Sequence, residues 1–518
     1  MLTTVIKFIA PAHSYRGKKT RMILKRFRNR RALDYSKACY DAHRQNYYAH
    51  AVMKDIVTQT AKVSIVVPCF NTPQKYFEPL LASVFAQGYQ NWELILIDAS
   101  NTPESTEYLL EKSSADSRIK YLKVKNEGIA INTNKGIEVA TGSYVAFLDH
   151  DDSLDPNALA ENMAMFIENP KLGLVYSDED KISDDGERYF EPHFKPGFSL
   201  DMLRNVNYIT HFVMVRKTIV DQVGCIREGY DGAQDYDFLL RVVDLGTQIG
   251  HVAKILYHWR QADGSTASNF ANKQHITQAG CRALEEHYGR RGIVNVQKVR
   301  AIKDRPGFYR AYYNKPKESL KILINLENTN LMPIEKDYII GCYRENKDVI
   351  TNNIEVIERK IQKTDLNTLV VNGAFIPSDE NTDILSLFAL AQEEHVGAVA
   401  PKIIRHGRIY DMGIVKVAGL SKNLFHNLSP DRFRGFGSLE WVRNVDSLTG
   451  NVQTVNGPKN TKERCIIWSH SEFIAFESEN HKRQERSSGE LYNSNILEVT
   501  EIYEASADYI SDLVTVKK

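Results

Sequence analysis

The chain has 518 residues and a formal charge of +1, from 66 Lys and Arg against 65 Asp and Glu. This balance excludes a nucleic-acid-binding protein that works through a positive field over a whole domain. The length predicts roughly two to four domains, and 42% apolar with 25% charged residues excludes a wholly disordered chain. The sequence has no apolar run of about 18–20 residues and no paired cysteine spacing, which excludes an integral membrane protein, a disulfide framework and a zinc site.

Residues 1–60 form a basic segment that we predict to be helical. The segment lacks the charged region and the cleavage site of a signal peptide, and the scattered cysteines indicate the reducing cytoplasm. Between Arg16 and Arg31 there are nine Lys or Arg and no acid, with apolar residues at roughly helical spacing. Two interpretations stay open: a solvated basic helix, or a contact with anionic lipid at the inner face of the cell membrane.

Residues 61–312 alternate between apolar runs and helical patterns. The runs predicted to be strands are Val63–Val67, Leu94–Ile97, Ile119–Val124 and Tyr144–Leu148. Strands and helices that alternate at the length of βα units are typical of a doubly wound sheet. The sequence therefore predicts an α/β fold for this domain.

Polar residues follow these strands at their carboxyl ends, where such sheets bind ligands. They are Pro68 to Asn71, Asp98, and Asp149-His150-Asp151-Asp152. A single Asp after a strand is usually a turn or cap residue. Three carboxylates in four residues repel one another unless a cation lies among them, and oxygen ligands suit Mg²⁺ or Mn²⁺ with a substrate diphosphate. We expect a divalent cation and a nucleotide diphosphate here.

Two common nucleotide-binding loops are absent from the sequence. There is no G-x-x-x-x-G-K-[ST] segment, and no G-x-G-x-x-G follows the first strand, which excludes a P-loop enzyme and a dinucleotide dehydrogenase. A sugar nucleotidyltransferase would be expected to place a glycine-rich basic loop after the first strand. The residues Pro68-Cys69-Phe70-Asn71-Thr72 do not supply one.

An ordered set of motifs runs through roughly residues 60–310. The motifs are Val63–Thr72, Trp92–Leu94, Asn126–Ile129, Ala140–Gly142, Leu148–Asp152, Tyr176–Lys181, Phe194–Pro196, Asn207–His211, Gln234–Asp237 and Tyr257–Arg260. Together they resemble family 2 glycosyltransferases of the GT-A fold, and in particular the bacterial branch that builds cell-surface polysaccharides, including rhamnosyltransferase-like members.

The resemblance implies an inverting transfer of a sugar from a UDP- or dTDP-sugar to a hydroxyl of a surface glycan or a lipid-linked acceptor. Asp98 would bind the nucleotide base, and Ala99 stands where the family often has a second acid, which leaves the base open. The donor-binding residues would be Pro68, Asn71, Asp98, Asp149 and Arg260, and the metal ligands Asp149, Asp151 and His258.

The resemblance also implies a general base, which matches Asp235. A helix cap is the alternative reading of Asp235, because Asp is favoured at helix starts, and Asp237 is the second candidate for the base. Asp152, His211 and Asp237 would line the acceptor or sugar pocket, together with Lys181 and Lys195. The run Asp178-Glu179-Asp180 is expected at a helix start or in an acceptor loop.

Residues 317–450 resemble a second glycosyltransferase module that has lost its chemistry. The place of the carboxylate cluster is taken by Leu369–Ala374, which contains no acid, and residues 451–518 are predicted to be a polar tail. We expect a non-catalytic module. The alternative for the whole chain is a glycan-assembly scaffold or binding protein in which the first module is inactive too.

Overall fold

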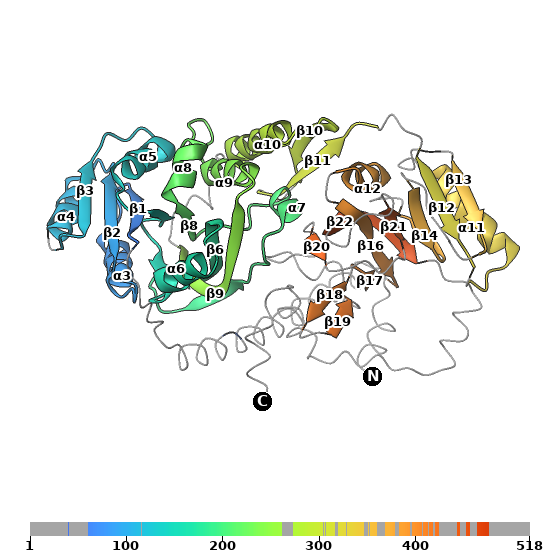
Figure 1. The fold of residues 1–518 in the computed structure, drawn as a ribbon, viewed down its shortest axis with the longest axis horizontal. Helices are drawn as coiled ribbons and strands as arrows, with labels where there is room; N and C mark the ends of the chain where they lie inside the picture. The colour runs from blue at the N-terminus through green and yellow to red at the C-terminus, as the bar shows by residue number, and fades with distance from the viewer. Residues whose placement is uncertain are drawn as a thin grey trace, which may run out of the picture.

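The computed structural model places two α/β modules side by side along the longest axis of the protein (Figure 1). It describes residue 40 and residues 61–315 without 115, 262–272, 304 and 306. Of the second module it describes residues 320–327, 329–346, 351, 353–359, 368–378, 383–393, 396–406, 408–412, 414–417, 420–423, 443–445, 452–455 and 464–475. The basic segment from Arg16 to Arg31 lies outside the described residues.

The first module is built on a nine-stranded sheet whose order is β3-β2-β1-β4-β8-β6-β9-β5, with β7 beside β6. Strands β1 to β4 are parallel, β8 runs antiparallel to both β4 and β6, and β9 is parallel to β6. The strands are β1 (Val63–Cys69), β2 (Trp92–Asp98), β3 (Ile119–Lys123), β4 (Tyr144–Phe147), β5 (Ser153–Leu154), β6 (Leu172–Ser183), β7 (Tyr189–His193), β8 (Val213–Arg216) and β9 (Gln248–Gln261).

Helices cover both faces of this sheet, because its central strands are apolar on both sides. Residues of β1 alternate between two cores: Val63, Ile65 and Val67 pack with α3 and α6, whereas Val66 packs with α5 and α9. The helices are α3 (Gln74–Phe85), α4 (Pro103–Ser113), α5 (Ile129–Val139), α6 (Ala158–Glu168), α7 (Leu200–Leu203), α8 (Lys217–Val223), α9 (Gln234–Asp244) and α10 (Lys273–Arg290). The four strands predicted from sequence are β1 to β4, and the α/β class is confirmed.

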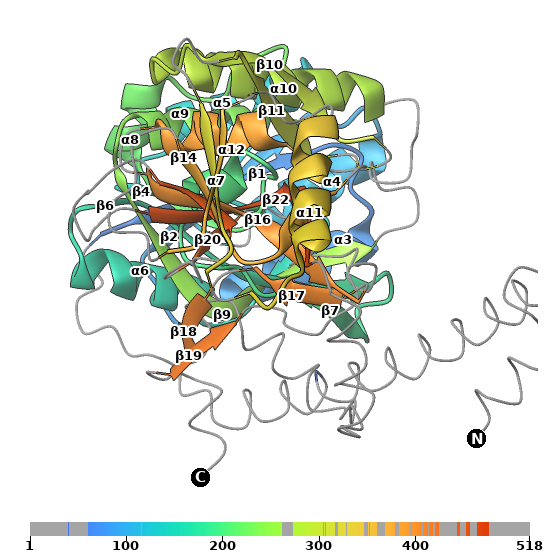
Figure 2. The same cartoon turned by 90° about the vertical axis from the view of Figure 1, so that its right-hand side faces the viewer.

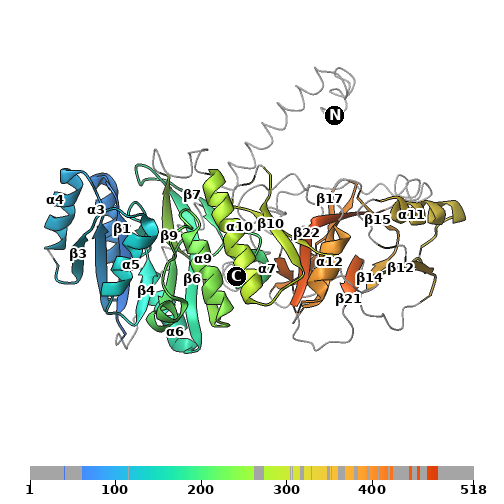
Figure 3. The same ribbon diagram turned by 90° about the horizontal axis from the view of Figure 1, so that it is seen from above.

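A two-stranded ribbon of β10 (Val296–Ala301) and β11 (Tyr309–Tyr313) leads from the first module to the second. The ribbon and α10 lie together at the top of Figure 1, where the two modules meet. Figure 3 shows the same succession from above. One core of buried side chains includes residues of α10, β11 and the second sheet, so the modules share apolar packing.

The second module repeats the strand order and polarity of the first. Its sheet has the order β13-β12-β14-β21-β16-β22-β15, with β17 beside β16 and β20 beside β22. The strands of the two sheets correspond in order: β13 to β2, β12 to β1, β14 to β4, β21 to β8, β16 to β6, β22 to β9 and β15 to β5. The parallel and antiparallel pairings of these strands are also the same. The expectation of a second GT-A-like module therefore has direct structural support.

The elements of the second module begin after residue 320, and Figure 2 shows them facing the viewer. They are β12 (Lys321–Asn325), α11 (Pro333–Glu345), β13 (Ile354–Ile357), β14 (Thr368–Asn372), β15 (Phe375–Pro377), α12 (Ile384–Ala391), β16 (Val396–Arg405), β17 (Arg408–Asp411), β18 (Ile414–Val417), β19 (Leu420–Asn423), β20 (Arg443–Val445), β21 (Val452–Val455) and β22 (Arg464–Ala475). β18 and β19 form a separate hairpin.

The predicted boundary at residue 450 is wrong, because β21 and β22 lie beyond it and belong to the second sheet. Sequence periodicity missed them because each is set by neighbours far along the chain: β21 pairs with β14 and β16. The module thus extends at least to Ala475. Among the helices described, none combines the length and the apolar character that crossing a membrane requires.

Candidate active site

A small pocket opens at the carboxyl ends of β1 and β4, where α5 and α9 begin. We call it the Asp235 pocket; its volume is about 120 Å³. Its polar lining comes from four segments of the chain, and its apolar walls include Pro68, Phe147, Phe238 and Tyr257. The polar residues are Thr133, Asp149, Thr210, His211, Gln234 and Asp235. Three predicted site residues, Asp149, His211 and Asp235, are therefore brought together with Pro68.

Asp235 lies in the first turn of α9, whose N-cap residue is Ala233, so Asp235 is not the cap of this helix. Nδ2 of Asn207 donates a hydrogen bond to Oδ2 of Asp235 over 3.0 Å. Burial raises the pKa of Asp235, and the neighbouring carboxylate of Asp149 adds to this effect. A half-buried carboxyl with a raised pKa, held by a side-chain amide, suits a general base.

His211 brings a positive charge to the same pocket. Its Nδ1 atom lies 3.1 Å from Oε2 of Glu179. Its ring stacks on Tyr257 at 5.5 Å and is tilted against Trp259 at 4.7 Å. Burial alone would lower the pKa of His211, but Glu179, Asp152 and Asp149 raise it to about 9. The imidazole is therefore cationic at neutral pH.

Asp149 and Asp151 lie on the loop that joins β4 to β5. Asp149 is exposed at the surface, yet the surrounding protein and the charge of Asp151 raise its pKa. Such repulsion is relieved by a cation, and Mg²⁺ or Mn²⁺ takes one or two protein carboxylates and completes its shell with water and phosphates. The two carboxylates fit that role, although the described residues include no cluster of three His, Cys, Asp or Glu that could hold an ion.

Asp98 and Asn71 tie the loops after β1 and β2 to the sheet. Asp98 is fully buried and accepts hydrogen bonds from the Ser100 amide, the Tyr121 hydroxyl and, over 3.0 Å, the Lys123 ammonium. Burial would raise the pKa of Asp98, but these donors lower it. Oδ1 of Asn71 accepts from the backbone amide of Asn101 over 2.9 Å. The Asp98 carboxylate is thus held by its own partners, and its contact with a nucleotide base stays a prediction.

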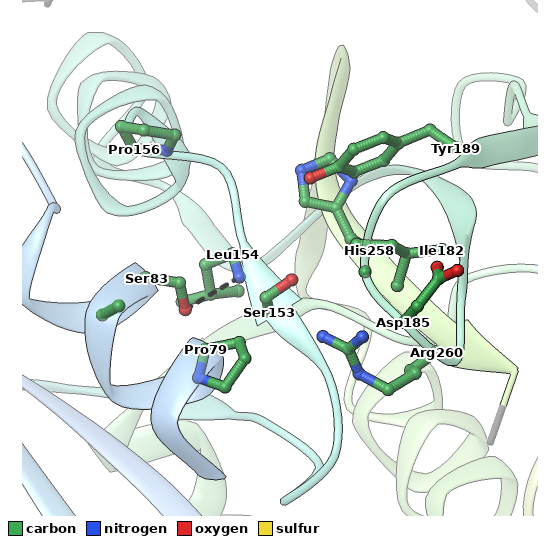
Figure 4. Close-up of a pocket in the computed structure, with 12 residues that line it drawn as sticks. Pro79, Ser83, Ser153, Leu154, Pro156, Ile182, Asp185, Tyr189, His258 and Arg260 are labelled. Atoms are coloured by element: carbon green, nitrogen blue, oxygen red, sulfur yellow. Dashed lines mark hydrogen bonds between the residues drawn. The ribbon is translucent and has the colours of Figure 1, made fainter. Parts of the chain in front are cut away.

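His258 and Arg260 lie on β9 but line a different cavity, shown in Figure 4. We call it the Arg260 pocket; its volume is about 480 Å³. Alternate residues of a strand point to opposite sides, so His258 and Arg260 point away from Tyr257 of the Asp235 pocket. Nδ1 of His258 lies 2.6 Å from Oδ1 of Asp180. The structure does not bring His258 to Asp149 in one pocket, and its predicted metal role stays a prediction.

The Arg260 guanidinium is held by backbone oxygens. Its Nε donates to the carbonyl of Asp151 over 2.8 Å, and Nη1 donates to the carbonyls of Ser183 and Asp184. In Figure 4 it points toward Ser153 and Pro79. Arg260 therefore supports the loop that carries Asp151, and any contact with a donor diphosphate stays a prediction.

Two predicted pocket residues have structural roles instead. Asp152 is buried and accepts from the Tyr257 hydroxyl and, over 2.7 Å, from the Arg260 amide, which fixes β9 to the loop. Asp237 is fully buried between Arg227 and Arg241, whose Nε atoms lie 3.0 and 2.9 Å from its Oδ2. Neither carboxylate lines the Asp235 pocket, which corrects both expectations and removes Asp237 as a base.

The run Asp178-Glu179-Asp180 is in strand β6, not at a helix start or in a loop. Each acid is buried and paired: Asp178 with His251, Glu179 with Lys195 and His211, and Asp180 with His258. Burial would raise the pKa of Glu179, but Lys195 and His211 hold it well below its usual range. Lys195 is fully buried and Lys181 pairs with Glu191, so neither lines the Asp235 pocket.

Sequence reasoning gave no role to two residues that shape the site. Asn207 binds Asp235, and Glu179 binds His211. Both residues lie inside motifs that carry the resemblance, and this was the sequence signal that could have identified them as site residues. Their partners are 28 and 32 positions away, so no local pattern could pair them.

Comparison with known proteins gives a consistent result. Residues 64–224 match the profile described as glycosyl transferase family 2. An uncharacterized protein of Sinorhizobium fredii is 32% identical over 429 residues, which is 75% of this chain and 47% of that protein. O-antigen biosynthesis protein RfbC of Myxococcus xanthus is 41% identical over 232 residues, which is 44% of this chain and 18% of that protein. This chain thus spans about half or less of these curated relatives.

Two further similarities have lower sequence identity, one to a synthase and one to a solved structure. Chondroitin synthase of Escherichia coli is 26% identical over 196 residues, which is 38% of this chain and 28% of that protein. The crystal structure of S. aureus TarS 1-349 in complex with UDP-GlcNAc is 18% identical, covers 46% of this chain and 67% of that one, and has a TM-score of 0.36.

Proposed function

The first module belongs to glycosyl transferase family 2 through residues 64–224, and we propose from this that the chain transfers a sugar from a nucleotide-diphosphate donor, a UDP- or dTDP-sugar, to a hydroxyl acceptor. The observation that carries the proposal is the Asp235 pocket, which holds a carboxyl of raised pKa, a cationic imidazole and the first Asp of the loop after β4. The acceptor is proposed to be a growing surface glycan or a lipid-linked sugar, in keeping with the name of the RfbC relative.

In the proposed reaction the acceptor oxygen attacks the anomeric carbon from the face opposite the diphosphate. A carbon–oxygen bond forms to the acceptor, the bond to the diphosphate oxygen breaks, and the configuration inverts. Asp235 accepts the hydroxyl proton, for which its raised pKa suits it near neutral pH. His211, which is cationic below pH about 9, offsets negative charge in the pocket.

Asp149 and Asp151 are proposed to hold Mg²⁺ or Mn²⁺. Bound there, the cation would stabilise the charge of the departing diphosphate. Arg260 would hold this loop in place through its hydrogen bond to the carbonyl of Asp151. The second module is proposed to be non-catalytic.

A screen of UDP- and dTDP-sugars with purified protein, with products identified by mass, tests the proposal. We expect turnover of at least one donor that requires Mn²⁺ or Mg²⁺, and an inverted anomeric configuration in the product. Calorimetry separates the enzyme from a scaffold. If no nucleotide diphosphate binds in the presence of either cation, the enzyme proposal fails and the scaffold alternative replaces it.

A further inference from the structure

One buried ion pair joins the two modules. Nη1 of Arg204 in the first module lies 2.7 Å from Oε2 of Glu393 in the second, and the two side chains are only 4% and 6% exposed. Arg204 is the C-cap residue of α7, which lies between the modules in Figure 1, and Glu393 follows α12. A buried charge is costly unless its partner stays in place. This pair therefore fixes the end of α7 against the second module.

Other contacts also hold the Arg204 side chain in place. Its Nε lies 3.1 Å from Nε2 of His287 in α10, and its guanidinium carbon lies 5.0 Å from the centre of the Tyr288 ring. Nη1 is also 3.4 Å from Oδ1 of Asp201. The side chain thus connects α7, α10 and the second module at one place.

The residues next to Arg204 in the chain are hydrogen-bonded to the helix turn that carries the candidate base. Asn205 exchanges hydrogen bonds with the backbone of Tyr309, from its side chain over 2.6 Å and to its carbonyl over 2.8 Å. Two residues later, Asn207 donates to Asp235 over 3.0 Å. Just before, the carbonyl of Leu203 accepts from the hydroxyl of Tyr236. Residues 203–207 therefore contact both Asp235 and its neighbour Tyr236.

We propose that Glu393 of the second module is a positioning residue for the first, because through Arg204 and residues 203–207 it sets the position of Asn207 against Asp235. This inference rests on the proposed function, in which Asp235 is the base. The hydrogen bond from Asn207 favours the ionised carboxylate and limits its rotation. A module without carboxylates at the end of β14 thereby contributes to the chemistry of its neighbour.

The test is Glu393→Gln in the full chain, assayed with the donor found in the sugar-nucleotide screen. Misplacement of a catalytic group by about 1 Å costs up to about 100-fold, so we expect kcat to fall roughly 10- to 100-fold with the donor KM unchanged. The acidic limb of the pH–kcat profile should move to higher pH, because a weaker bond from Asn207 leaves Asp235 easier to protonate. Asn207→Ala should reproduce this movement, and Glu393→Asp should restore part of kcat.

Asp383→Asn is the matched control. Asp383 also joins the modules, since its Oδ2 lies 2.6 Å from Nη2 of Arg310, and its Oδ1 caps α12 through the amide of Ser386. Asparagine preserves the cap, and the hydrogen bonds that place Asp383 run to Arg310 and to the amide of Ser386. We expect this variant to keep the kcat and the pH profile of the wild type.

Three results would overturn the inference. An active Glu393→Gln variant with wild-type kcat and pH profile would refute it while leaving the proposed function intact. An equal loss in Asp383→Asn would show general loosening of the modules instead of positioning. A wild-type chain that turns over no donor would refute the proposed function and this inference with it. If Glu393→Gln does not fold, Arg204→Lys, which keeps the buried charge, supplies the same readouts.

Discussion

Nδ1 of His211 lies 3.1 Å from Oε2 of Glu179, and both groups carry a charge at neutral pH. The pKa of His211 in the folded protein, about 9, is above its ordinary value of 6.5. The folded state therefore binds more protons than the unfolded state between these values, and stability falls with rising pH. The contribution of this pair is complete below pH 6.5 and is lost as the pH rises through about 9.

We expect the wild-type chain to lose stability and donor turnover as the pH rises through about 9, and His211→Gln to lose this dependence. Thermal unfolding and kcat/KM measured from pH 6 to 10 check both parts. A wild-type profile that stays flat in both measurements across this range would contradict the cationic state of His211.

Asp235→Asn is expected to lower kcat by about 100- to 10,000-fold, the usual contribution of a general base. The melting temperature should stay close to that of the wild type, because the amide still accepts from Asn207 and occupies the same volume. Donor turnover and differential scanning calorimetry provide the two measurements. Retained turnover would remove Asp235 as the base.

Asp237→Asn, unlike Asp235→Asn, is expected to lower the stability of the folded protein. Breaking a buried pair by neutralising one partner costs about 3–5 kcal/mol of unfolding free energy, and Asp237 is enclosed by Arg227 and Arg241. Denaturant unfolding of this variant beside Asp235→Asn measures the difference. An Asp237→Asn variant that is stable but inactive would return Asp237 to the list of candidate bases.

Asp149→Asn is expected to abolish the gain in nucleotide-diphosphate affinity that Mn²⁺ or Mg²⁺ provides. The physical reason is that Asp149 is exposed beside Asp151 and offers oxygen ligands to a cation. Titration calorimetry with and without the metal gives the readout. Asn372→Ala, the matching change at the end of β14 in the second module, should leave metal-dependent binding and turnover unchanged.

Deleting residues 1–33 is expected to abolish binding to anionic lipid vesicles, which should also weaken with salt because nine basic residues lie between Arg16 and Arg31. Vesicle co-sedimentation of the full and shortened chains, with neutral vesicles as the control, measures this. Unchanged binding by the shortened chain would leave the solvated helix as the interpretation of this segment.

The missing chemistry of the second module can be traced along its sheet. Between β21 and β22 there are only residues 456–463, whereas α8 and α9 lie between the matching β8 and β9, so the helix that carries Asp235 has no counterpart. The end of β14 carries Asn372-Gly373-Ala374 in place of the acids after β4. The sequence indicated the loss of the acids, because the residues that follow a strand are a local feature.

Local pattern alone was enough to predict β1 to β4 and the edge of the sheet where Pro68 and Asp149 lie, whereas the role expected of Asp235 came from the resemblance. Apolar runs and strand-end polar residues depend on neighbours within a few positions, and these are readable from the chain. Tertiary structure alone decided which charged groups are available. Asp98 lies within reach of Lys123, Asp237 of Arg227, and Asp180 of His258, which is 78 positions away. A buried carboxylate has a structural role where another side chain pairs with it and is available for chemistry where none does, and only folding brings such a partner near.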